Sequence, residues 1–313
     1  MKIDDIDAFV AVVRSLSLSQ AAKDMGLTQP AITRRVQNLE ESLGVELLDR
    51  NTKPPKPSAT GKLVYEQCRV VLAEIERLRE MVAADAAPSG GLRIGVTQGI
   101  GELVLPGALE NLRAHYPELS PHVNTGWGPQ LVDKVHDGEL DVAGVWLAAG
   151  AALPRNITGR VLDRTRLVVV ARRQEVTRRS YRLADWYQRG WILNPDGCGF
   201  RAGLRRALGS QSLPMVVRLD TNGRQLQLAL VAKGHGLGLV PLPLLAHSAQ
   251  RDALAIVPLS DFKPQIDLWL VHRPSLGKLQ TPVEQFGEHM AQVLATPAAE
   301  PATPAARAPR RRA

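Results

Sequence analysis

Apolar side chains in residues 4–14 recur at the spacing i, i+3, i+4 and i+7, which is typical of an amphipathic helix with one buried face. This stripe consists of Ile6, Phe9, Val10 and Val13. A second short helix is predicted to begin at Ser17, because Gln20 follows three residues later at the spacing of a capping box. It would run through Met25 and end at Gly26, which can adopt the left-handed conformation of a helix end.

A third helix is predicted directly after this glycine. Thr28 suits the cap position, and Pro30 fits the first turn, where a missing N–H costs nothing. The apolar face of this helix consists of Ile32, Val36, Leu39 and Leu43. Gly44 would end it, and the small Ala21 and Ala22 allow the second helix to cross it closely. Two helices joined by a tight turn form a helix-turn-helix.

The opposite face of the third helix is polar and suits base recognition in the major groove. It carries Gln29, Thr33, Arg34, Gln37 and Asn38. A glutamine can bond adenine and an arginine can bond guanine, each through two hydrogen bonds. The candidate DNA contacts on this helix are Gln29, Pro30, Thr33, Arg34 and Arg35, with Gln29, Thr33 and Arg34 as base readers and Arg35 on a phosphate. The alternative is a polar face that is merely solvated.

A proline-stiffened loop with two lysines follows at residues 51–57. Such a loop is typical of a wing that lies against the phosphates. The expected phosphate contacts in and before this loop are Arg50, Lys53 and Lys56.

Residues 60–84 predict one long helix, because no proline interrupts them. Apolar residues recur alternately four and three positions apart, as in a coiled-coil seam, and charged residues flank them. The seam consists of Val64, Cys68, Val71, Ile75, Leu78 and Val82. We favour a dimerising helix with Cys68 as a small apolar seam residue. The alternative is a helix that packs on its own domain. Pro88-Ser89-Gly90-Gly91 would form a hinge.

From residue 92 onward, apolar extended segments alternate with helical ones. This order predicts a three-layer α/β domain with largely parallel sheets. The expected strands are Leu92–Val96, Leu119–Thr125, Asp141–Trp146, Leu167–Ala171, Trp191–Asn194, Leu237–Val240 and Leu268–Val271. The expected helices are Leu103–His115, Gln130–His136, Arg201–Leu208 and Arg224–Ala232. Residues 296–313 are rich in Ala, Pro and Arg and are expected to be a disordered basic tail.

Composition places the chain among globular proteins of the cytoplasm. Its 313 residues are 44% apolar and 22% charged, which suffices for full cores in two or three domains. Two cysteines far apart favour a reducing compartment, and neither a signal peptide nor an apolar run of about 18 residues for a membrane span is evident. The formal net charge of +8 lies mostly in residues 88–295, so the charge of the predicted reader does not by itself indicate DNA binding.

Catalytic and metal-binding motifs are not found. The seven histidines are scattered without a zinc-ligand spacing. Neither a phosphate-binding Gly-rich loop with Lys-Ser/Thr nor a Gly-x-Ser-x-Gly elbow occurs. We therefore expect neither an enzyme nor a cofactor.

Several motifs in order resemble the LysR-type transcriptional regulators, over nearly the whole chain from Ile6 to about Ala295. The most specific are Ala21-Ala22, Leu27-Thr28-Gln29-Pro30-Ala31-Ile32-Thr33, Leu39-Glu40 with Leu43-Gly44, Leu47-Leu48-x-Arg50, Thr60-Gly61, Leu92-Arg93-Ile94-Gly95, Gly138-Glu139-Leu140-Asp141-Val142-Ala143 and Gly238-Leu239-Val240-Pro241. The chain departs from the family at Leu48, where Phe is usual, at Thr33, where Ser is common, and at Pro57-Ser58, where Leu-Thr is common.

The resemblance implies a multidomain α/β regulator in the cytoplasm. It would bind double-stranded DNA at an interrupted palindrome as a dimer through the linker helix, assemble further into a tetramer, and have RNA polymerase as a further candidate partner. The sensor would resemble a periplasmic binding protein, with two subdomains joined by two crossing strands. The expected parts are a winged helix-turn-helix at 1–59, a linker helix at 60–88, an effector-binding domain at 89–295 (subdomain I about 89–165 and 266–295, subdomain II about 166–265) and the tail.

The effector site is expected at loops that follow strands and open helices, because ligands of open α/β sheets bind at the carboxyl ends of strands. The candidates are Thr97, Gln98, Gly99, Ile100, Trp127, Gly128, Gln130, Cys198 and Gly199. The positive sensor domain favours an anionic effector, although its arginines could equally form a solvated surface. We interpret Cys198 as a pocket residue rather than a redox sensor, because no second cysteine lies near it in sequence.

Two other classes of protein remain as alternatives. The sensor fold alone would suit a small-molecule binding protein of the cytoplasm, and more remotely an enzyme built on the α/β domain.

Overall fold

The computed structural model describes residues 1–49, 52, 54–82 and 87–295. The chain divides into two compact units. The first comprises residues 1–86 with 275–277, and the second comprises residues 87–274 with the chain from residue 278 onward. The predicted basic tail lies outside the described residues.

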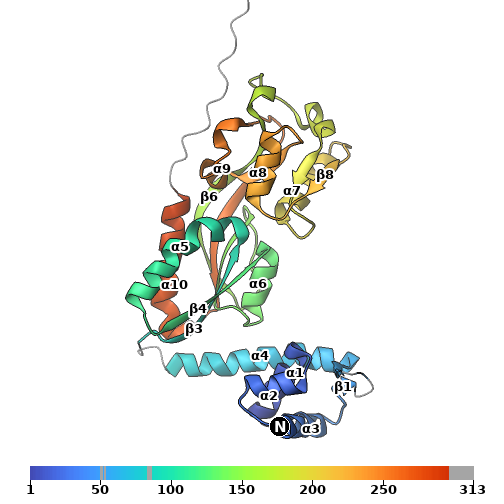
Figure 1. Cartoon of the computed structure of the whole chain (residues 1–313), viewed down its shortest axis with the longest axis vertical. Helices are drawn as coiled ribbons and strands as arrows, with labels where there is room; N and C mark the ends of the chain where they lie inside the picture. The colour runs from blue at the N-terminus through green and yellow to red at the C-terminus, as the bar shows by residue number, and fades with distance from the viewer. Residues whose placement is uncertain (50–51, 53, 83–86, 296–313) are drawn as a thin grey trace, which may run out of the picture. The chain divides into compact units, whose positions relative to one another are not determined.

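The first unit is a winged helix-turn-helix (Figure 1). Ser17 accepts a hydrogen bond from the backbone N–H of Gln20 at 3.2 Å, and Thr28 accepts one from Ala31 at 3.4 Å, so both predicted caps are confirmed. Gly26 ends the turn with φ +64°. The elements of this unit are α1 (Ile3–Ser15), α2 (Leu18–Asp24), α3 (Gln29–Leu43), β1 (Leu48–Asp49), β2 (Lys56–Pro57) and α4 (Ala59–Val82).

One apolar core holds the three short helices together. Phe9, Ile32 and Leu39 are completely buried in it. Leu43 was predicted on the same buried face, but this is wrong, because its side chain is 40% exposed. The chain turns back at Gly44, and Leu47 fills that end of the core instead.

The linker helix α4 begins as part of this same core. A Cβ on Gly61 would overlap the carbonyl oxygen of Leu47, which shows how closely the backbones approach. Val64 and Cys68 pack against the core, so the prediction that Cys68 faces a partner helix is wrong. Its burial raises the pKa of the thiol, and Cys68 acts as a small apolar core residue. Farther along the predicted seam, Val71 and Leu78 are exposed, at 39% and 64%.

The second unit is built around a seven-stranded mixed sheet with the order β10-β6-β11-β5-β3-β4, in which β9 also pairs with β6. Only β3, β4 and β5 are mutually parallel, while β6 pairs antiparallel with β9, β10 and β11, so the prediction of largely parallel sheets is wrong for this part. The strands are β3 (Gly90–Thr97), β4 (Leu119–Gly126), β5 (Val142–Ala148), β6 (Thr158–Arg172), β9 (Gly238–Pro241), β10 (Leu254–Ile256) and β11 (Gln265–His272).

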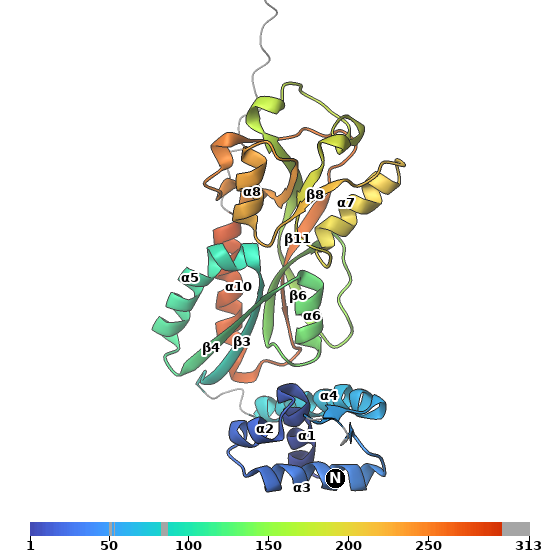
Figure 2. The ribbon, with the colours of Figure 1, turned by 45° about the vertical axis from the view of Figure 1, so that its right-hand side comes forward.

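The long strand β6 links the two halves of this unit. Its first part pairs with β11 as far as Arg166, and its last part, from Leu167, pairs with β9 and β10 (Figure 2). The second half also holds a parallel pair, β7 (Trp191–Leu193) and β8 (Val217–Asp220). Because β6 belongs to both halves, they share one continuous sheet.

Helices cover the two halves of the sheet system. Those of the first half are α5 (Gln98–His115), α6 (Gly128–His136) and α10 (Gln280–Leu294), and those of the second are α7 (Gly199–Gly209), α8 (Arg224–Ala232) and α9 (Leu242–Ala246). Short 3-10 turns lie at η1 (Arg173–Glu175), η2 (Leu183–Asp185), η3 (Tyr187–Arg189), η4 (Arg251–Ala253) and η5 (Gly277–Leu279). Among the described helices, none is both long and apolar enough to cross a lipid bilayer.

A buried carboxylate helps to hold the pairing of β11 and β6. Asp267 is 1% exposed and accepts hydrogen bonds from Arg164 Nε at 2.6 Å and from the backbone N–H of Gly150 at 3.2 Å. The hydrogen bond from Arg164 lowers the pKa of Asp267 below its ordinary value and outweighs the raising effect of burial. Asp267 therefore stays ionised inside the domain.

Candidate functional site

The first two turns of α3 present the predicted base-reading side chains. Gln29, Pro30 and Arg34 are exposed, and Thr33 is half-buried. Ser19 of α2 donates a hydrogen bond to the Gln29 side-chain oxygen at 3.0 Å, and so orients that amide. Sequence reasoning did not assign this role to Ser19, although its position in the short helix before the turn could have suggested it.

The predicted phosphate contacts differ in their surroundings. Arg35 lies 3.2 Å from Asp4 of α1, so part of its charge is already compensated within the reader. Lys56 is exposed on β2, opposite Asp49 of β1. Arg50 and Lys53 lie outside the described residues.

Glu40 fixes the wing to the recognition helix. Its side chain is buried in α3, and one carboxylate oxygen accepts the backbone N–H groups of Leu47 and Leu48 at 2.8 and 3.1 Å. Leu48 pairs with Pro57 in the β1–β2 ribbon, so the carboxylate positions the strand that opens the wing. The sequence motif containing Glu40 was noted without a role, because the partners are backbone groups that the sequence does not single out.

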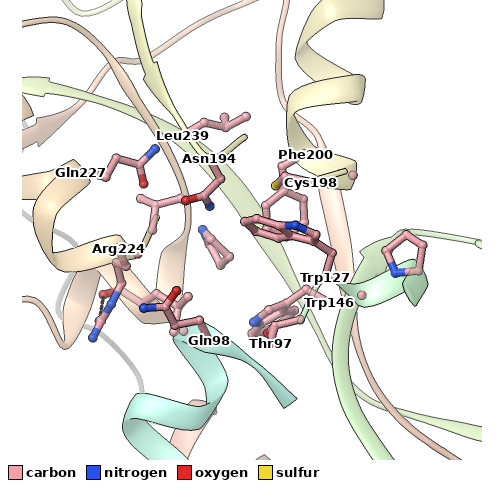
Figure 3. A pocket seen from close by; sticks show the side chains of 18 residues that line it. Thr97, Gln98, Trp127, Trp146, Asn194, Cys198, Phe200, Arg224, Gln227 and Leu239 are labelled. Atoms are coloured by element: carbon pink, nitrogen blue, oxygen red, sulfur yellow. Dashed lines mark hydrogen bonds between the residues drawn. The ribbon is translucent and has the colours of Figure 1, made fainter. Parts of the chain in front are cut away.

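A second candidate site is a pocket of about 660 Å³, part of it open to solvent, in the second unit (Figure 3). It is lined by the first turns of α5, α6, α7 and α8 and by β9. The predicted residues that line it are Thr97, Gln98, Gly99, Trp127, Gly128, Cys198 and Gly199. The structure therefore brings together loops that are distant in sequence.

Two predicted residues do not line this pocket. Ile100 is a completely buried residue of α5, and Gln130 is exposed on α6. Successive helical residues point about 100° apart, so a residue one or two positions from a lining residue faces another way.

The sequence missed several lining residues that come from other elements. These are Trp146 at β5, Arg224 and Gln227 on α8, and Leu239 on β9, with others around them. Asn194 also lines the pocket, and it opens the Gly-rich loop 194–201, whose position after a strand predicts that it faces the ligand. Arg224 begins a helix after β8, a strand that the hydrophobic pattern did not predict.

An ion pair that includes a lining residue of the pocket connects α5 and α8. Arg224 Nη2 lies 2.9 Å from Glu102 Oε2 of α5, and its Nη1 donates to the carbonyl oxygen of Leu244 at 2.7 Å. Because α5 belongs to the first half of the domain and α8 to the second, this pair joins the two halves.

Other polar atoms of the pocket have no partner. Buried side-chain atoms without a hydrogen bond among the described residues include Thr97 Oγ1, Trp146 Nε1 and Asn194 Oδ1. Buried polar groups are normally paired, so such atoms indicate a place for a ligand or water. Cys198 is a free, buried thiol at the start of α7. The described residues include no cluster of three or more metal-ligating side chains.

Comparison with known proteins assigns both units to one family. The family model "LysR substrate binding domain" matches residues 85–295, and "Bacterial regulatory helix-turn-helix protein, lysR family" matches residues 3–62. The chain belongs to the LysR family. It is therefore a DNA-binding transcriptional regulator with an effector-binding domain, as the sequence predicted.

Relatives of this LysR-family regulator match it over nearly their full length. The "hydrogen peroxide-inducible genes activator" of Pectobacterium carotovorum subsp. carotovorum is 26% identical over 306 residues, covering 93% of this chain and 97% of the relative. The "DNA-binding transcriptional dual regulator OxyR" of Escherichia coli K12 is 27% identical over 297 residues, covering 92% and 94%.

Solved structures have the same fold. Full-length OxyR from Pseudomonas aeruginosa is similar with a TM-score of 0.69 at 19% identity, covering 95% of both chains. CbnR in complex with its target DNA is similar with a TM-score of 0.58 at 20% identity, covering 94% of this chain and 100% of that one.

Proposed function

We propose that this LysR-family regulator reads an interrupted palindrome through α3 and that a small molecule in the pocket of residues 97–99, 127–129 and 198–200 controls promoter output. The observation that carries the proposal is that pocket, with its unpaired polar atoms, in the same chain as an exposed recognition helix. Gln29, Thr33 and Arg34 contact bases. Arg35, Arg50, Lys53 and Lys56 contact phosphates.

Self-association is part of this proposal. The exposed side chains of Val71 and Leu78 on α4 supply an apolar surface for a second copy, beyond the part of the helix that the reader core covers. A dimer places two readers on one palindrome, and further assembly gives a tetramer. RNA polymerase is a further proposed partner at the promoter.

The coupling between ligand and DNA acts through the two halves of the second unit. The Arg224–Glu102 pair joins them beside the pocket, so a ligand that favours a closed arrangement shifts the population toward it. The resulting change in the spacing of the readers alters DNA binding, and the coupling is reciprocal.

A footprint on DNA flanking the gene, at stated salt and with and without candidate ligands, tests this function. Arg34→Ala should weaken specific binding by about 1–3 kcal/mol and relax the preference at one base pair. Arg14→Ala removes an exposed positive charge from α1 and serves as the control. A protein that protects no DNA, or an Arg34→Ala variant that matches the control, contradicts the proposed reading.

Oxidation of Cys198 is a second candidate for the signal, because this thiol lines the pocket and relatives are named for hydrogen peroxide. Peroxide would convert the thiol to a sulfenic acid and release water. The other cysteine, Cys68, belongs to the other unit. The proposed signal is therefore the sulfenic acid of Cys198 itself and not a disulfide between the two cysteines. Peroxide treatment followed by the same footprint, with Cys198→Ser as the control, tests it. An unchanged pattern excludes it.

We further propose that the pocket binds its ligand without turnover. Incubation of the full-length protein with any ligand found, followed by mass analysis of that ligand, tests this point.

A further inference from the structure

A second pocket lies along strand β6 in the second half of the second unit. It has a volume of about 1040 Å³, part of it open to solvent. Its walls are residues 166–169 of β6, Arg179 and Ser180, and residues 255–263, and we call it the β6 groove. It shares no lining residue with the pocket of about 660 Å³, so the two are separate sites.

The groove exists because the chain between β10 and β11 leaves β6 for six residues. The N–H of Val257 donates to the carbonyl oxygen of Val169 at 2.8 Å, and that of Leu167 donates to the carbonyl oxygen of Pro264 at 3.0 Å. These two anchor points are two residues apart on β6 but seven residues apart on the other chain. Residues 258–263 therefore bulge away from the strand and leave a gap beside it.

Tyr181 holds the outer walls of the groove in place. Its backbone N–H donates to the carbonyl oxygen of Pro258 at 3.0 Å, and its carbonyl oxygen accepts from the N–H of Ser260 at 2.9 Å. Its hydroxyl oxygen accepts two backbone N–H groups of the turn at residues 177–180, both at 2.8 Å. The backbone that carries Arg179 is therefore fixed against the loop on the other side of the groove.

The side chains of the groove are positively charged. Arg166, Arg179 and Lys263 line it, and no Asp or Glu is among the described residues that do so. Arg179 and Lys263 are exposed, and neither forms an ion pair within the described part of the chain. The acidic residue of the loop, Asp261, instead accepts the backbone N–H of Leu183 at 3.0 Å. The positive charge at the groove is therefore not neutralised by its own walls.

The half of the unit that contains the groove is also strongly basic. Residues 166–265 hold 15 Lys and Arg against six Asp and Glu, a net charge of +9. Residues 88–165 and 266–295 together hold eight Lys and Arg against 11 Asp and Glu, a net charge of −3. The fold thus concentrates the positive charge of the second unit in one half, and such a field raises the local concentration of anions.

We propose that the β6 groove binds a small molecule that carries a phosphate or diphosphate group. An arginine side chain fits phosphate oxygens with two parallel N–H donors, and a lysine adds a compact charge. A phosphate ester carries about −1.5 to −2 charges at pH 7, so several cations without a local carboxylate favour it over a singly charged anion.

Other groups of the groove suit the rest of such a molecule. The hydroxyl of Ser180 is a further hydrogen-bond donor, and the half-buried Phe262 and Ile256 offer apolar contacts. This site goes beyond the proposed function, because it requires neither DNA reading nor a ligand in the other pocket.

The first test is a titration with small phosphates. Full-length protein is titrated calorimetrically, at stated low salt, with phenyl phosphate and with pyrophosphate. Phenyl sulfate has the shape of phenyl phosphate but a single charge, and it serves as the matched probe. We expect saturable binding of phenyl phosphate, pyrophosphate or both, at least about fivefold tighter than that of phenyl sulfate. No saturable binding of either phosphate probe at millimolar concentration overturns the inference.

The second test removes the two unpaired cations. Arg179→Gln and Lys263→Gln should each weaken the phosphate probe about threefold or more, and the double variant about tenfold or more. The matched controls are Arg206→Gln and Lys233→Gln, which remove exposed charges of the same half that do not line the groove. These controls should change the affinity less than about twofold, because exposed charges far from a ligand are screened.

Equal losses in the groove variants and the controls would show that only the overall charge attracts the probe, and would overturn the inference. Phenyl sulfate that binds as tightly as phenyl phosphate, and is weakened as much by Arg179→Gln, would overturn the preference for phosphate. Both substituted side chains are exposed, so the variants should fold like the wild type, and thermal unfolding checks this.

DNA is the other source of phosphate groups. The double variant is therefore also compared with the wild type in DNA binding over a range of salt concentrations. Unchanged DNA binding together with lost affinity for the phosphate probe supports the small-molecule site. Weaker DNA binding with a reduced salt dependence, together with unchanged probe affinity, would assign the two cations to the DNA backbone and overturn it.

Discussion

Replacing Glu40 by alanine should loosen the wing of the reader. The carboxylate is the acceptor for the buried N–H groups of Leu47 and Leu48, at 2.8 and 3.1 Å. Leaving a buried donor unsatisfied costs about 1–3 kcal/mol, so the two donors together predict a loss of about 2–6 kcal/mol. That range is comparable to the whole stability of a small domain.

Two matched variants separate the hydrogen bonds from other effects. Both N–H groups donate to the same oxygen, Glu40 Oε1, and glutamine offers an oxygen at that position. Glu40→Gln should therefore cost only about 1 kcal/mol, for the lost charge assistance. Glu41→Ala removes an exposed carboxylate one position along α3 and should leave the stability nearly unchanged.

Hydrogen exchange of the peptide that contains residues 45–58, together with urea unfolding, measures the effect. We expect fast exchange in Glu40→Ala, slow exchange in the other two variants, and weaker DNA binding in Glu40→Ala because Lys56 loses its fixed position on the wing. Equal protection and equal stability in Glu40→Ala and Glu41→Ala would refute the reasoning.

Two further predictions concern packing and pH. Gly61→Ala should destabilise the reader by about 1–3 kcal/mol or more, because the added Cβ would overlap the backbone carbonyl of Leu47, which cannot move without shifting the chain. Urea unfolding measures this loss, with substitution of the exposed neighbour, Lys62→Ala, as the control. Equal unfolding midpoints of the two variants would contradict the prediction. The hydrogen bond from Arg164 lowers the folded pKa of Asp267, so its stabilising contribution is full above the unfolded pKa and is lost as pH falls through the lower folded one. The free energy of unfolding of the wild type should therefore fall between about pH 5 and pH 2, and that of Asp267→Asn should fall less. The same pH dependence in both proteins would contradict this prediction.

The sequence by itself determined the elements whose causes are local. Helix periodicity and the caps Ser17 and Thr28 predicted the helix-turn-helix, because a cap and its N–H partner lie within three residues of each other. Alternating strands and helices likewise predicted that the loops after β3 and β4 face a ligand, and both loops line the pocket.

Only the tertiary structure decided what depends on residues far apart. The heptad spacing of Cys68 is the same whether a partner helix or its own domain covers the side chain. The structure shows that Cys68 packs in the core of its own reader. The helix Arg224–Ala232 was predicted with the correct bounds, but strand β8 is too short and too exposed to give a hydrophobic signal, so the position of Arg224 at the pocket was missed. The pairing of Arg224 with Glu102, across more than a hundred residues, and the unpaired indole of Trp146 exist only once the two halves share one sheet. Local periodicity records which face of an element is buried, but not which other element buries it.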